Sequence, residues 1–180
     1  MKLSTFDEGL VHLKYLMLYP KKDNSYVIVD KLNVNYSSSS ECNIDYCRKN
    51  LISTTFLERL GSTFVLNKGD FVFLHCNQED NFINKWEFFL QKKLSQYNLT
   101  LTYEHNDFLI NGKKVMGSFG QKLRDNYFLS VICMSVKDSS ELVKDICLKT
   151  INKTPGSWEE YNISTDIIEK WYLEFIFYFK

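Results

Sequence analysis

The sequence lacks several features that would point to a particular class of protein. Its 180 residues include no alanine and only two prolines, and no apolar run is long enough to cross a membrane. Neither sign of charge is in excess, because 22 lysines and arginines balance 22 aspartates and glutamates. Broad binding to nucleic acid or anionic lipid needs a basic excess, so neither partner is expected. The missing alanine, beside abundant asparagine, lysine and phenylalanine, is typical of an AT-rich genome, such as that of a bacteriophage or an AT-rich bacterium.

Cysteine and histidine are too few and too scattered to predict a metal site. The chain has five cysteines and three histidines, and only Cys42 and Cys47 are close in sequence, at a spacing typical of neither zinc nor redox motifs. The N-terminal segment carries Asp7, Glu8 and Lys14, unlike a secretory signal. We therefore expect reduced thiols in a cytoplasmic protein. The sequence has no nucleophile elbow, Walker loop or dinucleotide-binding glycine motif.

Apolar residues are plentiful, at 44% of the chain, and 16% are aromatic, which predicts a folded core. We expect one domain over residues 1–180, with no room for an accessory C-terminal domain. Apolar spacings of three and four predict helices at residues 4–19, 80–97, 139–150 and from 164 onward. Strand patterns occur at residues 26–30, 54–64, 71–76, 99–103, 106–110, 113–118 and 127–136.

The order of these segments predicts an α+β fold, with a mixed, mainly antiparallel sheet flanked by helices. The strand at 127–136 has apolar residues on both faces, so we place it centrally. A turn signal at 67–70 predicts an antiparallel hairpin between the strands on either side. The serine-rich residues 35–40 are predicted to form a polar loop.

Residues 106–118 contain the best candidate for a site. Asn111-Gly112 separates two strand-like runs, which is the strongest short-range signal for a β-hairpin. In a type I′ register Leu109 pairs with Lys114, so Asp107 lies on the same face as Lys114, diagonally at roughly 7–8 Å. The ammonium could bind a phosphate, while the carboxylate orients it or holds a magnesium ion.

Other residues of this hairpin have more than one interpretation. Gly117 leaves space where a ligand could approach the strand closely. Asn106 points to the opposite face in the ideal register, so either a β-bulge redirects it or it only supports the turn. An ordinary exposed hairpin without a ligand is the alternative for the whole segment.

Three segments occur in an order that resembles one superfamily of enzymes. The stretch Asn-Asp-Phe-Leu-Ile-Asn-Gly-Lys-Lys-Val-Met-Gly-Ser, from Asn106 to Ser118, is similar to the "R-N-D … G-K-K-I-x-G-S-A" signature of lipoate–protein ligases, biotin–protein ligases and octanoyltransferases. Residues 58–65 resemble the family's arginine- and glycine-rich strand, and residues 127–137 its late strand. The resemblance covers most of the chain, from about residue 5 to 150.

The resemblance implies a biotin/lipoate ligase catalytic domain that uses ATP and Mg²⁺. Such an enzyme activates a small carboxylic acid, of the lipoate, octanoate or biotin class, as an acyl-adenylate and attaches it to a lysine of an acceptor carrier domain. Lys114 would be catalytic, contacting oxygens on which negative charge develops. The implied substrate-binding residues are Arg59, Gly61, Asn106, Asp107, Gly117 and Ser118. The residues that would hold a metal stay undefined.

The sequence also departs from the family pattern. The family has two arginines and three glycines where this chain has one of each, followed by Ser62 and Thr63. Those side chains would crowd a backbone that normally lies against the ligand. Asn126 and Tyr127 stand where a histidine is expected. Octanoyltransferases use a nucleophilic cysteine, but Cys133 lies inside a predicted strand and is expected in the core.

Two functional hypotheses follow. The first is an active lipoate–protein ligase-like acyltransferase, which depends on the intact Lys114 hairpin. The second is a catalytically decayed ligase fold that serves as a protein-binding or structural module, for example in a bacteriophage. The evidence for this hypothesis is Ser62, Thr63 and the missing histidine. Nucleic-acid binding is supported only by the lysines of the helix at 80–97, which we interpret as a solvated face.

Overall fold

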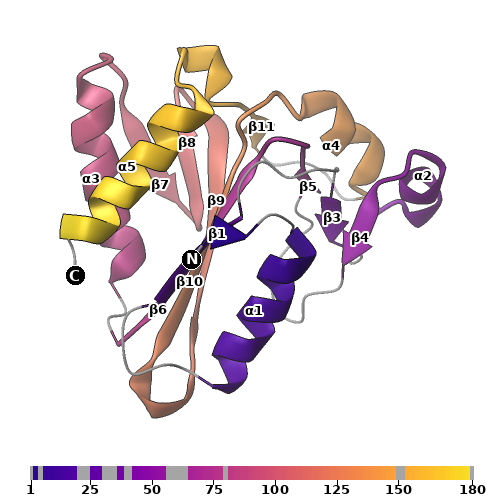
Figure 1. Ribbon diagram of the computed structural model, residues 1–180. Coiled ribbons are helices and arrows are strands. Elements are labelled where there is room, and N and C mark those ends of the chain that lie inside the picture. The colour runs from indigo at the N-terminus through magenta and orange to yellow at the C-terminus, as the bar shows by residue number, and fades with distance from the viewer. Residues whose placement is uncertain are drawn as a thin grey trace.

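The computed structural model describes residues 2–3, 6–19, 25–29, 36–38, 42–55, 65–78, 81–148 and 153–178. Their strands form two sheets (Figure 1). The larger has eight strands in the order β1 (Lys2–Leu3), β2 (Ser25–Val29), β6 (Phe71–Asn77), β10 (Phe128–Met134), β9 (Lys113–Lys122), β8 (Asp107–Ile110) and β7 (Leu101–Glu104), with β11 (Thr154–Pro155) also beside β9. Its pairs are antiparallel except β1 with β2 and β9 with β11. The predicted mixed, mainly antiparallel sheet is confirmed, and so is the central position of β10.

The second sheet is small, with the strand order β4 (Ser53–Thr55), β3 (Tyr36–Ser38) and β5 (Val65–Leu66). β3 pairs in parallel with β4 and antiparallel with β5. The prediction of a polar loop at 35–40 is therefore wrong for residues 36–38. Backbone pairing on both sides makes this segment a strand, although its composition is typical of a loop.

The turn predicted at 67–70 does not join a hairpin, because the strands on either side belong to different sheets. β5 pairs with β3, whereas β6 lies between β2 and β10. The carboxylate of Asp70 accepts hydrogen bonds from the backbone N–H of Asn67 at 2.8 Å and of Val136 at 2.7 Å. These bonds fasten the turn to the chain that follows β10. Of the strand predicted at 54–64, residues 56–64 lie outside the described part.

The helices are α1 (Phe6–Leu18), α2 (Ile44–Lys49), α3 (Phe82–Ser95), α4 (Ser140–Ile146) and α5 (Thr165–Tyr178), with short 3-10 turns η1 (Arg124–Asn126) and η2 (Glu159–Tyr161). Four of them match the predicted helices, and α2 has no predicted counterpart. Among the described residues, none of these helices combines the length and the apolarity that a bilayer span requires.

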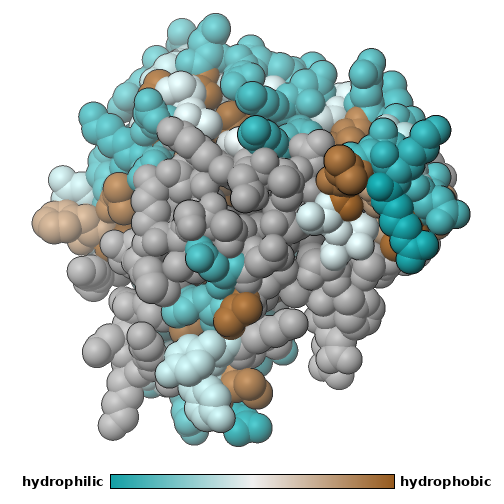
Figure 2. Space-filling model, turned by 45° about the vertical axis from the view of Figure 1, so that its right-hand side comes forward, coloured by the Kyte–Doolittle hydropathy of each residue, from teal (hydrophilic) through white to brown (hydrophobic). Residues whose placement is uncertain are grey.

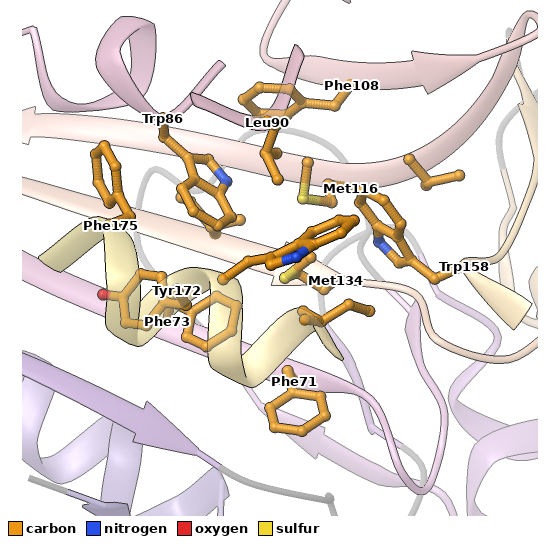
Figure 3. Close-up of a cluster of buried hydrophobic side chains, with 14 of the residues drawn as sticks. Phe71, Phe73, Trp86, Leu90, Phe108, Met116, Met134, Trp158, Tyr172 and Phe175 are labelled. Carbon is orange, nitrogen blue, oxygen red and sulfur yellow. The ribbon is translucent and has the colours of Figure 1, made fainter. Parts of the chain in front are cut away.

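An aromatic core lies between the large sheet and the helices α3 and α5, which run side by side in Figure 1. Phe73 of β6 stacks on Tyr172 of α5 with ring centroids 3.8 Å apart, and Trp86 of α3 meets Phe175 at 5.1 Å (Figure 3). Phe108 of β8 and Met116 of β9 belong to the same core. Since side chains alternate along a strand, Asp107 and Leu109, on either side of Phe108, point to the opposite face of the sheet.

The face of the molecule drawn in Figure 2 is mainly hydrophilic over its described residues, and apolar side chains on it are separated by polar ones. Large exposed apolar residues do occur on α1, including Val11 and Leu18. Together with Tyr15 and Tyr19 they recur at intervals of three and four, so they share one side of the helix.

Candidate functional site

Two tight turns at the edge of the large sheet build the candidate site. At the predicted hairpin both central residues have positive φ, 52° at Asn111 and 75° at Gly112, which defines a type I′ turn. The turn between β7 and β8 has the same character, with φ of 51° at His105 and 69° at Asn106. The predicted register, with Leu109 opposite Lys114, is confirmed. Leu109 lies between two core residues of β8, so Lys114 points away from the aromatic core.

A β-bulge changes the rest of the hairpin. Beyond the pair Leu109–Lys114 the register shifts, and Phe108 pairs with Met116, so that Val115 is the extra residue of β9. Asp107 consequently faces Gly117. The sequence left open whether a bulge occurs, and the structure contains one.

Lys114 and Asp107 are in direct contact on the face of the hairpin that is opposite the aromatic core. The ammonium nitrogen of Lys114 lies 2.7 Å from Oδ1 of Asp107, with side chains 40% and 20% exposed. The contact lies directly over Gly117, where a Cβ would be 3.5 Å from the Lys114 nitrogen and 3.8 Å from Oδ1 of Asp107, which are ordinary contact distances. The space over Gly117, which we expected to admit a ligand, is occupied by the Lys114 side chain.

Lys153, which the sequence did not suggest, completes this cluster. Its ammonium nitrogen lies 3.3 Å from Oδ2 of Asp107 and 3.9 Å from a carboxylate oxygen of Glu104, and it donates a hydrogen bond of 2.8 Å to the backbone carbonyl of Glu104. Lys153 reaches the site because the next residues form β11, where Thr154 pairs with Lys113. Gly156 permits this close approach, because a Cβ there would lie 2.7 Å from Cβ of Lys113, but a single glycine in the sequence does not indicate which strand it will lie against.

Asn106 and Ser118 form a separate group around Tyr103. The backbone carbonyl of Asn106 accepts hydrogen bonds from the backbone N–H of Ser118 at 2.7 Å and from its hydroxyl at 3.2 Å. The Tyr103 hydroxyl donates to Oδ1 of Asn106 at 3.2 Å. Ser118 follows Gly117 along β9, so its side chain points to the opposite face. Of the two alternatives for Asn106, these contacts favour support of the turn.

The neighbouring lysine, Lys113, is engaged elsewhere. Its ammonium nitrogen lies 2.5 Å from Oε2 of Glu160, and this hydrogen bond raises the pKa of Lys113. The second oxygen of Glu160 accepts from the backbone N–H of Ser157 at 3.1 Å. Of the two hairpin lysines, Lys114 is therefore the one that faces Asp107.

Cys133 lies on β10 directly opposite Gly117. Burial raises the pKa of the Cys133 thiol to about 12, against the opposing charge of Lys114. A thiol with this pKa stays protonated near neutral pH and is a poor nucleophile. The expectation that Cys133 lies in the core is wrong, because its side chain is only half-buried and outside the aromatic core, but its raised pKa does not favour a nucleophilic role.

The cluster is suited to an anion rather than to a metal ion. Within the described part of the chain, no group of three or more histidine, cysteine, aspartate or glutamate side chains could hold a metal. Asp107, which we considered as a magnesium ligand, has an ammonium group near each of its oxygens. An anion could instead reach the exposed side of Lys114. The predicted residues Arg59 and Gly61, with Ser62 and Thr63, lie outside the described residues.

Comparison with known proteins gives no match in sequence and a clear match in fold. No protein-family model and no curated protein matches the chain. P. falciparum LipL1, solved with lipoate, has a TM-score of 0.82 at 14% identity; the alignment covers 99% of this chain and 58% of LipL1. This chain thus spans little more than half the length of LipL1.

Two further structures extend the match. A bi-partite lipoate protein ligase from Thermoplasma acidophilum, described with its E2 lipoyl domain, has a TM-score of 0.73 at 14% identity, covering 97% of this chain and 79% of that one. The biotin protein ligase from Aquifex aeolicus, with biotin and ATP, has a TM-score of 0.58 at 13% identity, covering 97% and 66%. The predicted biotin/lipoate ligase type of fold is confirmed, since this chain shares the fold of these lipoate and biotin protein ligases.

Proposed function

We propose that the protein is a lipoate–protein ligase-like acyltransferase. It activates a lipoyl- or octanoyl-type acid and attaches it to a lysine of a carrier domain. In the first step the carboxylate of the acid displaces pyrophosphate from ATP and gives an acyl-adenylate. In the second step the amine of the carrier lysine displaces AMP and loses a proton. The shared fold supports this class of reaction, since neighbours of this fold are described with lipoate, with biotin and ATP, or with a lipoyl domain.

The observation that carries the proposal is the fixed ammonium group of Lys114. Asp107 holds it at 2.7 Å, and the side chain is still 40% exposed. A lysine ammonium has three N–H donors, so donors remain for the oxygens of a ligand. In both steps negative charge grows on phosphate or carbonyl oxygens, and a cation already held in place stabilises that charge without reorganisation.

The other predicted residues have assigned parts in this proposal. Gly117 lies beneath the contact between Lys114 and Asp107, while Asn106 and Ser118 hold the turn before β8 in shape. Arg59 and Gly61 would wall the acyl chain, as the family resemblance implies. Mg²⁺ would accompany the phosphates of ATP.

A catalytically decayed ligase fold that binds another protein is the second candidate. The internal pairing of Lys114 with Asp107 favours it, because an ion pair that is already satisfied does not require a ligand. The serine and threonine at the family's glycine positions favour it too.

Formation of the acyl-adenylate separates the two candidates. The protein is incubated with ATP, Mg²⁺ and radiolabelled lipoate, octanoate or biotin, and products are resolved by thin-layer chromatography. An adenylate formed by the wild type and by Lys113→Ala, but lost in a folded Lys114→Ala, supports the acyltransferase. Lys113 is the matched control because it is adjacent in the chain and paired with Glu160 instead. No adenylate with any of the acids, together with a stable protein partner in a pull-down, supports the decayed fold.

A further inference from the structure

We propose that Lys153 is a positioning residue that keeps Asp107 paired while Lys114 turns toward a phosphate group. This inference rests on the proposed function, in which Lys114 contacts the phosphates of ATP. Neither the sequence nor the family resemblance pointed to Lys153.

The two lysines share one carboxylate. Lys114 lies 2.7 Å from Oδ1 of Asp107, and Lys153 lies 3.3 Å from Oδ2. Lys153 is the less exposed lysine, at 21% against 40%. It is also held by the backbone carbonyl of Glu104 at 2.8 Å. The geometry thus contains one anchored ammonium, one carboxylate and one ammonium that is freer to move.

The anchored ammonium lowers the cost of releasing the freer one. Asp107 is only 20% exposed, and a largely buried carboxylate is destabilised when it loses its partner. With Lys153 in place, Asp107 keeps one ion pair after Lys114 moves its donors to a ligand. Without Lys153, the same movement would leave Asp107 unpaired, so Lys114 would be retained by Asp107.

The charges also indicate the class of ligand. Lys114 and Lys153 carry two positive charges against the single negative charge of Asp107, while Glu104 is more than half exposed and 3.9 Å away, where water screens it. Because Lys153 alone can neutralise Asp107, the charge of Lys114 remains available for a ligand. An anion with several negative charges attracts that ammonium group most strongly. We therefore assign the phosphate end of a nucleotide, or pyrophosphate, as the group that draws Lys114 away.

Binding, measured without turnover, tests this role. The affinities of Mg²⁺-ATP and of inorganic pyrophosphate are measured by isothermal titration calorimetry for the wild type and for Lys153→Met, Lys153→Arg and Lys113→Met. Lys153→Met should weaken binding by about five-fold, the upper range for a partly exposed ion pair. Lys153→Arg, which keeps the charge, should restore most of the affinity, and Lys113→Met should bind like the wild type.

The double variant Asp107→Asn/Lys153→Met separates positioning from a merely structural role. Removal of the competing carboxylate should free Lys114, so the double variant should bind more tightly than Lys153→Met alone. A double variant no tighter than Lys153→Met, or a Lys153→Met protein that binds like the wild type, would overturn the role of Lys153. If the wild type binds neither probe, the proposed function itself fails. If the wild type binds and Lys153→Met binds equally well, only the role of Lys153 fails.

Discussion

Asp70 offers a quantitative test of the packing behind the site, because its carboxylate has no exposed surface. Burial raises the pKa of Asp70 to about 7, although hydrogen bonds from the backbone N–H groups of Asn67, Val136 and Lys137 and the charge of Lys137 act in the opposite direction. Desolvation therefore outweighs the favourable bonds. This residue fastens the turn before β6 to the segment after β10.

The raised pKa makes the stability of the protein depend on pH. Between about pH 4 and pH 7 the folded protein binds a proton that Asp70 has lost in the unfolded chain. The free energy of unfolding therefore falls as the pH rises through this range and levels off above it. The gap between the ordinary pKa of 3.8 and about 7 corresponds to roughly 4 kcal/mol from this group.

Asp70→Asn removes the titration while keeping the shape of the side chain. Urea unfolding of both proteins at about pH 5 and about pH 8 should show Asp70→Asn gaining stability relative to the wild type as the pH rises, by a few kcal/mol at most. Comparing the two proteins at each pH cancels the titration of all other groups. A difference between them that does not change with pH would refute the reasoning, since it would mean that Asp70 is ionised throughout.

Further predictions concern the core, β11 and the thiol behind the site. Phe73→Ala should lower the free energy of unfolding by about 3–5 kcal/mol, whereas the exposed Phe88→Ala should change it by less than about 0.5 kcal/mol in the same urea titration. Gly156→Ala should cost about 1–3 kcal/mol because its Cβ would overlap Lys113, while Gly120→Ala, with 3.7 Å of clearance, should cost less. Cys133 should resist iodoacetamide at about pH 8 until the protein unfolds, because its pKa is about 12; labelling in the native state, located by mass spectrometry, would contradict this.

The hairpin of the site could be predicted because its signal is local. Asn111 and Gly112 adopt the positive φ that a type I′ turn demands, and such a turn fixes the first pairs of the ladder. That reasoning placed Asp107 and Lys114 on one face. It could not supply the bulge at Val115, because the shift depends on how β9 pairs with several neighbours, and those contacts come from distant parts of the chain.

The errors and omissions share a non-local origin. β3 is a strand because β4 and β5 pair with it, and its own serines carry no such signal. The turn at 67–70 has hairpin composition, yet Asp70 ties it to Val136, far along the chain. Lys153 enters the site through the pairing of β11 with β9, which no local pattern announces. Helix α2 is the exception, since Asn43 accepts a capping hydrogen bond from the backbone N–H of Tyr46, a signal that the sequence carried.

Exchange of labelled pyrophosphate into ATP, measured with and without the carboxylic acid substrate, tests the central claim most directly. This exchange reports the adenylation step without a carrier domain. With lipoate or octanoate present, the wild type and Lys113→Ala should exchange label, and Lys114→Ala should be slower by about 10²–10³-fold, as expected when one fixed donor to a developing charge is removed. Exchange by Lys114→Ala at the wild-type rate would contradict the assignment of Lys114. No acid-dependent exchange by the wild type would contradict the proposed adenylation itself.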